Sequence, residues 1–156
     1  MLNAGILVVG TIEQKSAKSQ QDQIDTNMYH VVMLAKMLLP KLKERKSGAF
    51  IVNSSSSYLK CFPGSVVYSA SKAFLTQWTE GIAFELRHSN IDVQCLCPNG
   101  TRTNIIKHDA FGYVATPVEK VVAACNRQLG RSKDDVLCFG TPFNEISTNM
   151  VFVGVG

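Results

Sequence analysis

Hydrophobic residues recur every three or four positions over a long segment in the first third of the chain, as they do on one face of a helix. The segment runs from Ser19 to about Lys46, and Ser19 and Asp22 have the spacing of an N-cap followed by an acid in the first turn. Pro40 falls inside the pattern, so it is expected to kink the helix or to end its regular part. The residues of the apolar face are Ile24, Met28, Val31, Ala35, Leu38, Leu39 and Leu42.

The rest of the chain alternates between short apolar runs and helical patterns. Residues 49–53 and 91–97 are β-prone runs with the length of buried strands, and 136–139 is expected to be a final strand. Residues 67–87 and 118–129 show helical spacing. With a strand stub at the start of the chain, the predicted order is strand, helix, strand, helix, strand, helix, strand.

This alternation predicts an α/β fold, because right-handed crossovers between such elements build a parallel sheet with helices on both faces. No repeat or linker divides the sequence, so residues 1–156 are expected to form a single domain. In open parallel sheets, ligands bind beyond the carboxyl ends of the strands. The candidate ligand-binding segments at those ends are Asn3-Ala4-Gly5, Ser54-Ser55 and Pro98-Asn99-Gly100.

Composition narrows the classes of protein. The chain is 46% hydrophobic and 18% charged, with a formal net charge of +4, which is typical of a globular protein. Its basic residues are scattered or lie at helix ends, so no nucleic-acid partner is expected, and no apolar run reaches the length of a membrane span. Cys95 and Cys97 alternate along a predicted strand and are expected to be buried thiols. Neither a disulfide framework nor a metal site is predicted, and a cytoplasmic location is expected.

A tyrosine and a lysine on one predicted helix carry the main chemical signal. Tyr68 and Lys72 are four residues apart, so their side chains are neighbours on one face of the helix. A phenol with a pKa of about 10 is a poor acid–base catalyst at neutral pH, and an adjacent cation lowers that pKa. The spacing alone is weak evidence, because such pairs also arise by chance. Ser55, at the end of a predicted strand, can donate a hydrogen bond to a substrate oxygen; Ser56 is the alternative, and both also fit an ordinary serine-rich loop.

Five ordered elements of the sequence together resemble the short-chain dehydrogenase/reductase family. They are Asn3-Ala4-Gly5, Asn27, residues 48–55, residues 68–72, and Pro98 to Thr103. Residues 63–74 look most like the subgroup of hydroxysteroid dehydrogenases and 3-ketoacyl-CoA reductases. The resemblance implies a Rossmann-like, doubly wound fold of which this chain is the second half, without the N-terminal nucleotide-binding half. The apolar residues at both ends of the chain agree with structure missing on both sides.

The resemblance also implies a role for each matching residue. Tyr68 would be the general acid or base, Lys72 would lower its pKa and bind the nicotinamide ribose, and Ser55 would polarise the substrate oxygen. Asn27 would hold a water that links Lys72 to solvent. The cofactor would be NAD or NADP, with NADP slightly favoured. Its expected contacts are Asn3, Ala4, Gly5, Tyr68, Lys72, Pro98, Asn99, Gly100 and Thr103.

The function implied by the resemblance is NAD(P)-dependent interconversion of a carbonyl and an alcohol by hydride transfer. Two departures weaken it: Asn99 stands where many members have glycine, and no G-x-G-x-x-G turn occurs in the sequence. The 156-residue chain alone is therefore expected to bind NAD(H) or NADP(H) weakly or not at all. The alternative is a truncated, non-catalytic remnant that acts in packing or partner binding. A serine hydrolase is a weaker third reading, because the sequence lacks a G-x-S-x-G elbow.

Substrate and assembly are expected only in outline. The expected partner is a small-molecule carbonyl or alcohol substrate. Phe111, Tyr113 and Val114, between Lys107 and Pro117, suggest that it is apolar, such as a lipid, steroid or acyl chain, although a role for them in core packing is at least as well supported. In the family, the two long helices commonly pair across a two-fold axis. By resemblance, helices 19–46 and 67–87 are expected to form a homodimer or homotetramer.

Overall fold

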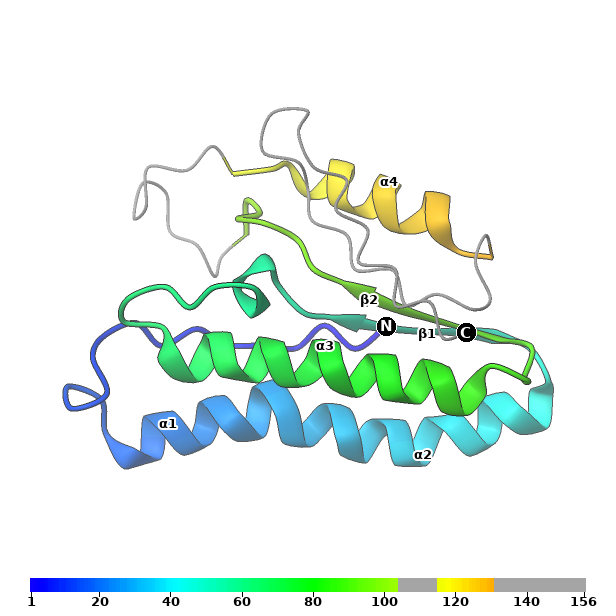
Figure 1. Ribbon diagram of the computed structural model, residues 1–156, viewed down its shortest axis with the longest axis horizontal. Helices are drawn as coiled ribbons and strands as arrows, with labels where there is room; N and C mark the ends of the chain where they lie inside the picture. The colour runs from blue at the N-terminus through cyan, green and yellow to red at the C-terminus, as the bar shows by residue number, and fades with distance from the viewer. Residues whose placement is uncertain (104–114, 131–156) are drawn as a thin grey trace.

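The computed structural model describes residues 1–103 and 115–130. The chain begins with an extended segment that leads into a long helical stretch. Strands and helices then alternate (Figure 1). The elements are α1 (Ala17–Ile24), a π-helical turn (Asp25–Tyr29), α2 (His30–Arg45), β1 (Gly48–Asn53), a 3-10 helix (Ser56–Tyr58), α3 (Val66–Leu86), β2 (Ile91–Leu96) and α4 (Val118–Gln128).

The strands of the sheet are parallel, as predicted. β1 pairs with β2 in a register that sets Gly48 opposite Ile91 and Asn53 opposite Leu96. The strand stub at the start of the chain forms a single parallel bridge, between Leu2 and Val52, on the other side of β1. Leu2 N donates to Ile51 O at 2.7 Å, and Asn53 N donates to Leu2 O at 3.0 Å. The strand predicted at 136–139 lies outside the described residues.

Helices cover both faces of the sheet, which confirms the predicted layer arrangement. α1, α2 and α3 lie along one face, and α4 lies on the other (Figure 1). The core between the sheet and α2–α3 includes Val52 and Leu75, both almost fully buried, and the Phe50 ring meets the Trp78 ring edge-on at 6.3 Å between centroids. α4 is joined to β2 by Cys125, whose Sγ donates to Gln94 Oε1 at 3.3 Å.

The first helix differs from the prediction at its N-cap, and of the two alternatives predicted at Pro40 the structure excludes an end to the helix. Its N-cap is Ser16, whose Oγ accepts from Ser19 N at 3.1 Å. The N-cap therefore lies three residues before the predicted one, Ser19. Pro40 does not end the helix, because α2 continues through it to Arg45. Leu39 and Leu42 on either side of the proline pack against the core, and this packing offsets the one backbone hydrogen bond that proline removes.

The remaining boundaries lie within one or two residues of the expected ones. Cys95 and Cys97 are buried thiols, as predicted. In the described ranges, no helix combines the length and the hydropathy that crossing a bilayer requires.

Candidate active site

Tyr68 and Lys72 lie on adjacent turns of α3 and on the same face of that helix. The Lys72 Nζ atom is 5.5 Å from the centroid of the Tyr68 ring. Both residues are near the N-terminal end of α3, which lies against the carboxyl end of β1, since Ser54 Oγ donates to Lys72 O at 2.8 Å. The pair is therefore at the edge of the sheet where a doubly wound fold binds its ligands.

The Lys72 amine is buried, with 4% of the residue exposed. Its Nζ atom donates to Asn53 O, the last carbonyl of β1, at 2.9 Å. Burial lowers the pKa of Lys72 from 10.5 to about 8, and the nearby thiols of Cys95 and Cys97 oppose that change. An amine with this pKa changes protonation state close to neutral pH, as a group in a proton path must.

The pKa of the Tyr68 phenol corrects the sequence-based expectation. Burial raises this pKa above 10.0, and a hydrogen bond with Ser55 works against the rise. The expected lowering by Lys72 does not prevail, because the amine is turned to Asn53 O and removal of water from the phenol disfavours phenolate. The phenol therefore keeps its proton at neutral pH.

Of the two candidate serines, Ser55 is the one that meets the phenol. It follows β1 in an extended conformation and caps the 3-10 helix, where Ser57 N donates to Ser55 Oγ at 3.2 Å. Its side chain is near enough to Tyr68 to lower the pKa of the phenol against the effect of burial. Ser56 instead makes a backbone hydrogen bond, in which Ser56 N donates to Pro98 O at 3.0 Å.

Asn27 is fully buried and lies in the π-helical turn. Its Nδ2 donates to Ile6 O at 3.0 Å and to Ser71 Oγ at 3.1 Å, and its Oδ1 accepts from Ile6 N at 2.8 Å. Both amide hydrogens are thus used, and one lone pair of Oδ1 is left to accept a further hydrogen. A Cβ on Gly5 would lie 3.5 Å from Asn27 Oδ1 and 3.7 Å from Lys72 Nζ, so Gly5 lies beside both groups.

The other residues expected to contact a cofactor surround the same edge of the sheet. Asn3 and Ala4 are exposed, and Asn53 Nδ2 donates to Asn3 Oδ1 at 2.6 Å. The loop after β2 is fixed by Thr116, whose N donates to Gly100 O at 2.8 Å. Pro98, Asn99 and Gly100 are partly exposed and Thr103 is exposed. Most of the expected substrate segment, including Phe111, Tyr113 and Val114, lies outside the described residues.

Gln23 and Asn53 were not singled out by sequence reasoning. Asn53 contributes a backbone carbonyl to Lys72, which no side-chain pattern can reveal. Gln23 is 1% exposed, and its Oε1 accepts from Val8 N at 2.6 Å. A signal for it did exist, because Gln23 precedes Asn27 by one helical turn and both polar residues interrupt the apolar face of the first helix.

Comparison with known proteins identifies a family. Residues 1–111 match the family described as short chain dehydrogenase. The chain is 30% identical over 141 residues to a very-long-chain 3-oxoacyl-CoA reductase of Mycosarcoma maydis, covering 84% of this chain and 40% of that protein. It is 35% identical over 96 residues to retinol dehydrogenase 8 of Bos taurus, covering 62% of this chain and 31% of the relative. The chain thus spans less than half the length of these relatives.

Solved structures agree with the sequence comparison. A short-chain dehydrogenase from Sphingobium yanoikuyae, in complex with NADPH, superposes with a TM-score of 0.82 at 26% sequence identity. The match covers 92% of this chain and 56% of that one. With the parallel sheet, its helical layers and the matched sequence in agreement, the chain belongs to the short-chain dehydrogenase family.

Proposed function

We propose that this chain carries the catalytic residues of an NAD(P)-dependent oxidoreductase that interconverts a carbonyl and an alcohol. The observation that carries the proposal is geometric: the buried Lys72 Nζ donates to the last carbonyl of β1 at 2.9 Å and lies 5.5 Å from the Tyr68 ring centroid. Ser55 acts on the same phenol at the carboxyl end of the sheet. Two hydroxyl groups that converge there can both bind one substrate oxygen. Such convergence in a ligand crevice is what general acid–base catalysis requires.

Tyr68 acts in this scheme as the proton donor to the substrate oxygen when a carbonyl is reduced. Its raised pKa keeps the phenol protonated at neutral pH, and Ser55 shares the developing negative charge on the oxygen through a second hydrogen bond. In the direction of alcohol oxidation the same phenol has to accept a proton, and burial makes phenolate costly. The same residue serves both directions, because the group that donates the proton in reduction accepts it in oxidation.

Lys72 and Asn27 provide the path by which that proton is replaced. A water beside Gly5 can donate to the remaining lone pair of Asn27 Oδ1 and exchange a proton with Lys72 Nζ, since Gly5 adjoins both atoms. Lys72 then gives a proton towards the Tyr68 phenolate and recovers one from that water. The Nζ atom is 5.5 Å from the centroid of the Tyr68 ring. This role for Asn27 is narrower than the sequence suggested, because its amide hydrogens are already bound to Ile6 O and Ser71 Oγ.

The residues at this edge of the sheet fit a nicotinamide cofactor. Gly5 lies next to Lys72, since a Cβ on Gly5 would be 3.7 Å from Lys72 Nζ. The segments Asn3-Ala4-Gly5 and Pro98 to Thr103, which are partly or largely exposed, flank this position. The cofactor supplies or accepts the hydride. Related structures hold NADPH or NADH; we propose NADP with slight preference over NAD.

For the substrate, we propose an apolar carbonyl or alcohol with a long hydrocarbon portion. The support is that relatives include a very-long-chain 3-oxoacyl-CoA reductase and a retinol dehydrogenase. Both names describe substrates that join one reactive oxygen to a long apolar body.

The test is an assay of NADPH and NADH oxidation by the full-length gene product, because the 156-residue chain alone is expected to bind the cofactor weakly. The substrates are a panel of long-chain ketones, 3-oxoacyl thioesters and retinoid aldehydes. We expect Tyr68→Phe to lower kcat/KM by at least about 100-fold, as loss of a general acid does, without changing the melting temperature appreciably. Tyr29→Phe is the matched control, because it removes a hydroxyl from a tyrosine that is 60% exposed and away from the site. Turnover retained in Tyr68→Phe would contradict the role of Tyr68. A folded chain without turnover on any of these substrates would support the non-catalytic alternative.

A further inference from the structure

Two buried carboxamides on successive turns of the first helix hold one segment of the chain. Asn27 Oδ1 accepts from Ile6 N, and Gln23 Oε1 accepts from Val8 N at 2.6 Å. Both side chains are almost completely buried. Four helical residues rise about 6 Å, and two residues of extended chain span about 6.6 Å. The two carboxamides therefore match alternate N–H groups of the segment.

The held segment connects the Lys72 amine with the loop that precedes α3. At one end, Gly5 adjoins Lys72 Nζ and Asn27 Oδ1. At the other end, Gly10 N donates to Gly64 O at 2.9 Å. Gly64 has φ +75 and approaches the backbone of Gly10 closely, since a Cβ on Gly64 would lie 3.3 Å from Gly10 N. Residues 5–10 thus run from a position beside the amine to the loop that precedes α3.

We infer that Gln23 is a positioning residue, which fixes residues 6–8 and so holds Gly5 against the Lys72 amine. Gln23 is far from the reacting atoms and acts through the backbone that it binds. The effect of Gln23 on catalysis rests on the proposed function. The effect of Gln23 on residues 6–8 and on Lys72 is independent of that function. Without the carboxamide, Val8 N loses its acceptor inside the protein, and the segment is free to move outwards to bind water instead.

Such a movement would change the surroundings of Lys72 in a defined way. The groups that now face the amine are the Asn53 carbonyl, the Tyr68 ring, and the thiols of Cys95 in β2 and of Cys97 just after that strand. Removal of water is the main cause of the low pKa of Lys72. Water admitted by displacement of Gly5 would reverse that effect, and the other facing groups stay in place.

The test compares three substitutions at Gln23 in the full chain. Gln23→Leu removes the acceptor, Gln23→Asn keeps the carboxamide but makes it too short to reach Val8 N, and Gln23→Glu keeps an oxygen at the same reach. Gln21→Leu is the matched control on the same helix, because Gln21 is exposed. We expect the Val8 amide to exchange with deuterium at least ten times faster in the Leu and Asn variants, and at the original rate in Gln21→Leu. Gln23→Glu keeps the acceptor but buries an ionisable group, so slow exchange is expected only at a pH where that carboxyl group is protonated.

The second measurement is the pH at which covalent labelling of the Lys72 amine is half-maximal, read by mass spectrometry of the peptide. We expect a midpoint near 8 in the unchanged chain and a rise towards 10.5 in Gln23→Asn and Gln23→Leu. Unchanged exchange at Val8 would overturn the inference, and so would faster exchange with an unchanged midpoint. Gln23→Asn keeps the test decisive where Gln23→Leu does not fold. Neither measurement needs turnover, so failure here is distinct from failure of the proposed function.

Discussion

Lys72 and Tyr68 respond to the same burial in opposite senses. Removing water disfavours the charged form of each group, so the pKa of the amine falls to about 8 and that of the phenol rises. Sequence reasoning found the two residues and their shared face but gave the wrong direction for the phenol. The direction depends on how much water the packed chain removes from the phenol, which the spacing of the two residues does not reveal.

The low pKa of Lys72 predicts a pH-dependent stability. The folded-state pKa of about 8 lies below the ordinary 10.5, so the unfolded chain binds more protons between these two pH values and stability rises with pH there. The full effect, on the order of 3 kcal/mol, destabilises the fold below pH 8. We therefore expect the free energy of unfolding of the unchanged chain, minus that of Lys72→Met, to become more positive from pH 7 to pH 10.

Urea denaturation at pH 7 and at pH 10 measures this difference. Taking it between the two proteins cancels the titration of other groups that they share. A difference that is equal at both pH values would show that Lys72 titrates normally in the folded state.

At the scale of elements, the geometry of the first helix depends on contacts with residues distant in sequence, which the helix's own pattern does not predict. The π-helical turn at Asp25–Tyr29 places Asn27 against Ile6 and Ser71, and π turns of this kind often occur at functional sites. Amphipathic spacing predicted that the segment is helical because it reports burial of one face. It did not predict the extra residue in the turn, because that turn is stabilised by residues far away in the sequence.

At the end of α2, replacing a residue by glycine is expected to stabilise the fold. Lys46 is the C-cap and has left-handed backbone angles, φ 56 and ψ 25, which glycine adopts without a Cβ penalty. We expect Lys46→Gly to raise the free energy of unfolding by about 0.5–1 kcal/mol. Thermal or urea denaturation measures the change.

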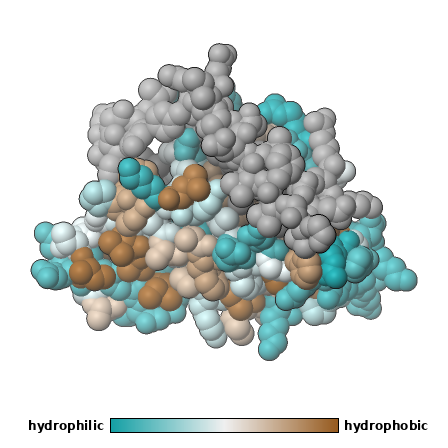
Figure 2. Space-filling model, in the orientation of Figure 1, coloured by the Kyte–Doolittle hydropathy of each residue, from teal (hydrophilic) through white to brown (hydrophobic). Residues whose placement is uncertain are grey.

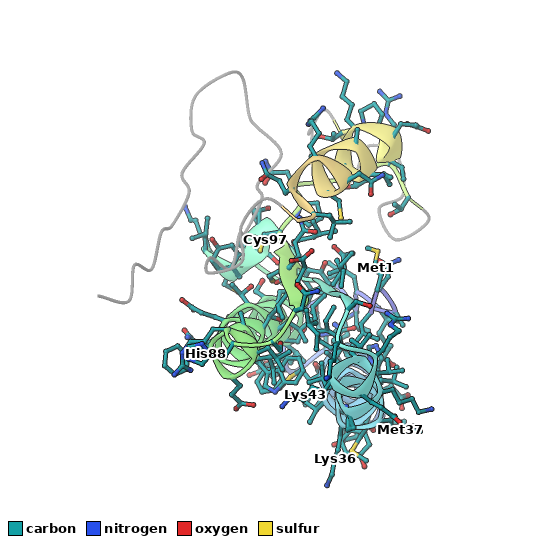
Figure 3. All side chains as sticks on the ribbon, turned by 90° about the vertical axis from the view of Figure 1, so that its right-hand side faces the viewer. Met1, Lys36, Met37, Lys43, His88 and Cys97 are labelled. Carbon is teal, nitrogen blue, oxygen red and sulfur yellow. The ribbon has the colours of Figure 1, made fainter. Side chains whose placement is uncertain are left out.

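Lys36→Gly is the control for this prediction. Lys36 is exposed in the middle of α2 and points away from the sheet (Figure 3), so the same replacement there should cost about 1 kcal/mol of helix stability. Loss of stability in both variants would contradict the argument from the backbone angles of Lys46.

For the whole molecule, the outer surface of α2 is unusually apolar. Tyr29, Met33 and Met37 recur every four residues and are 60%, 40% and 63% exposed, and Met37 points away from the sheet (Figure 3). The space-filling view shows apolar side chains among polar ones over the helical layer (Figure 2). On α3, Val66 and Phe84 are 54% and 50% exposed. Exposed apolar residues that gather on one face commonly mark a protein interface. We propose that two copies of the chain pair through these helices.

This pairing predicts a change in molecular mass. We expect sedimentation velocity to give a dimer or tetramer for the unchanged chain and a smaller species for Met37→Asp, because a charge would be buried in the interface. Val122→Asp is the control, since Val122 is 50% exposed on α4, on the opposite face of the sheet. A monomeric unchanged chain, or an equal effect of both substitutions, would contradict the proposal.

The sequence by itself determined the alternation of helices and strands and the parallel sheet, because periodicity is a local property of the chain. Its resemblance to the family proposed Asn27, Ser55, Tyr68 and Lys72 as site residues. Only the tertiary structure decided that Ser55 rather than Ser56 meets the phenol, that Lys72 binds the Asn53 carbonyl, and that burial outweighs the amine at Tyr68. These outcomes depend on distances between segments up to some tens of residues apart and on how much water the packed chain excludes. Neither quantity is written in the order of the residues.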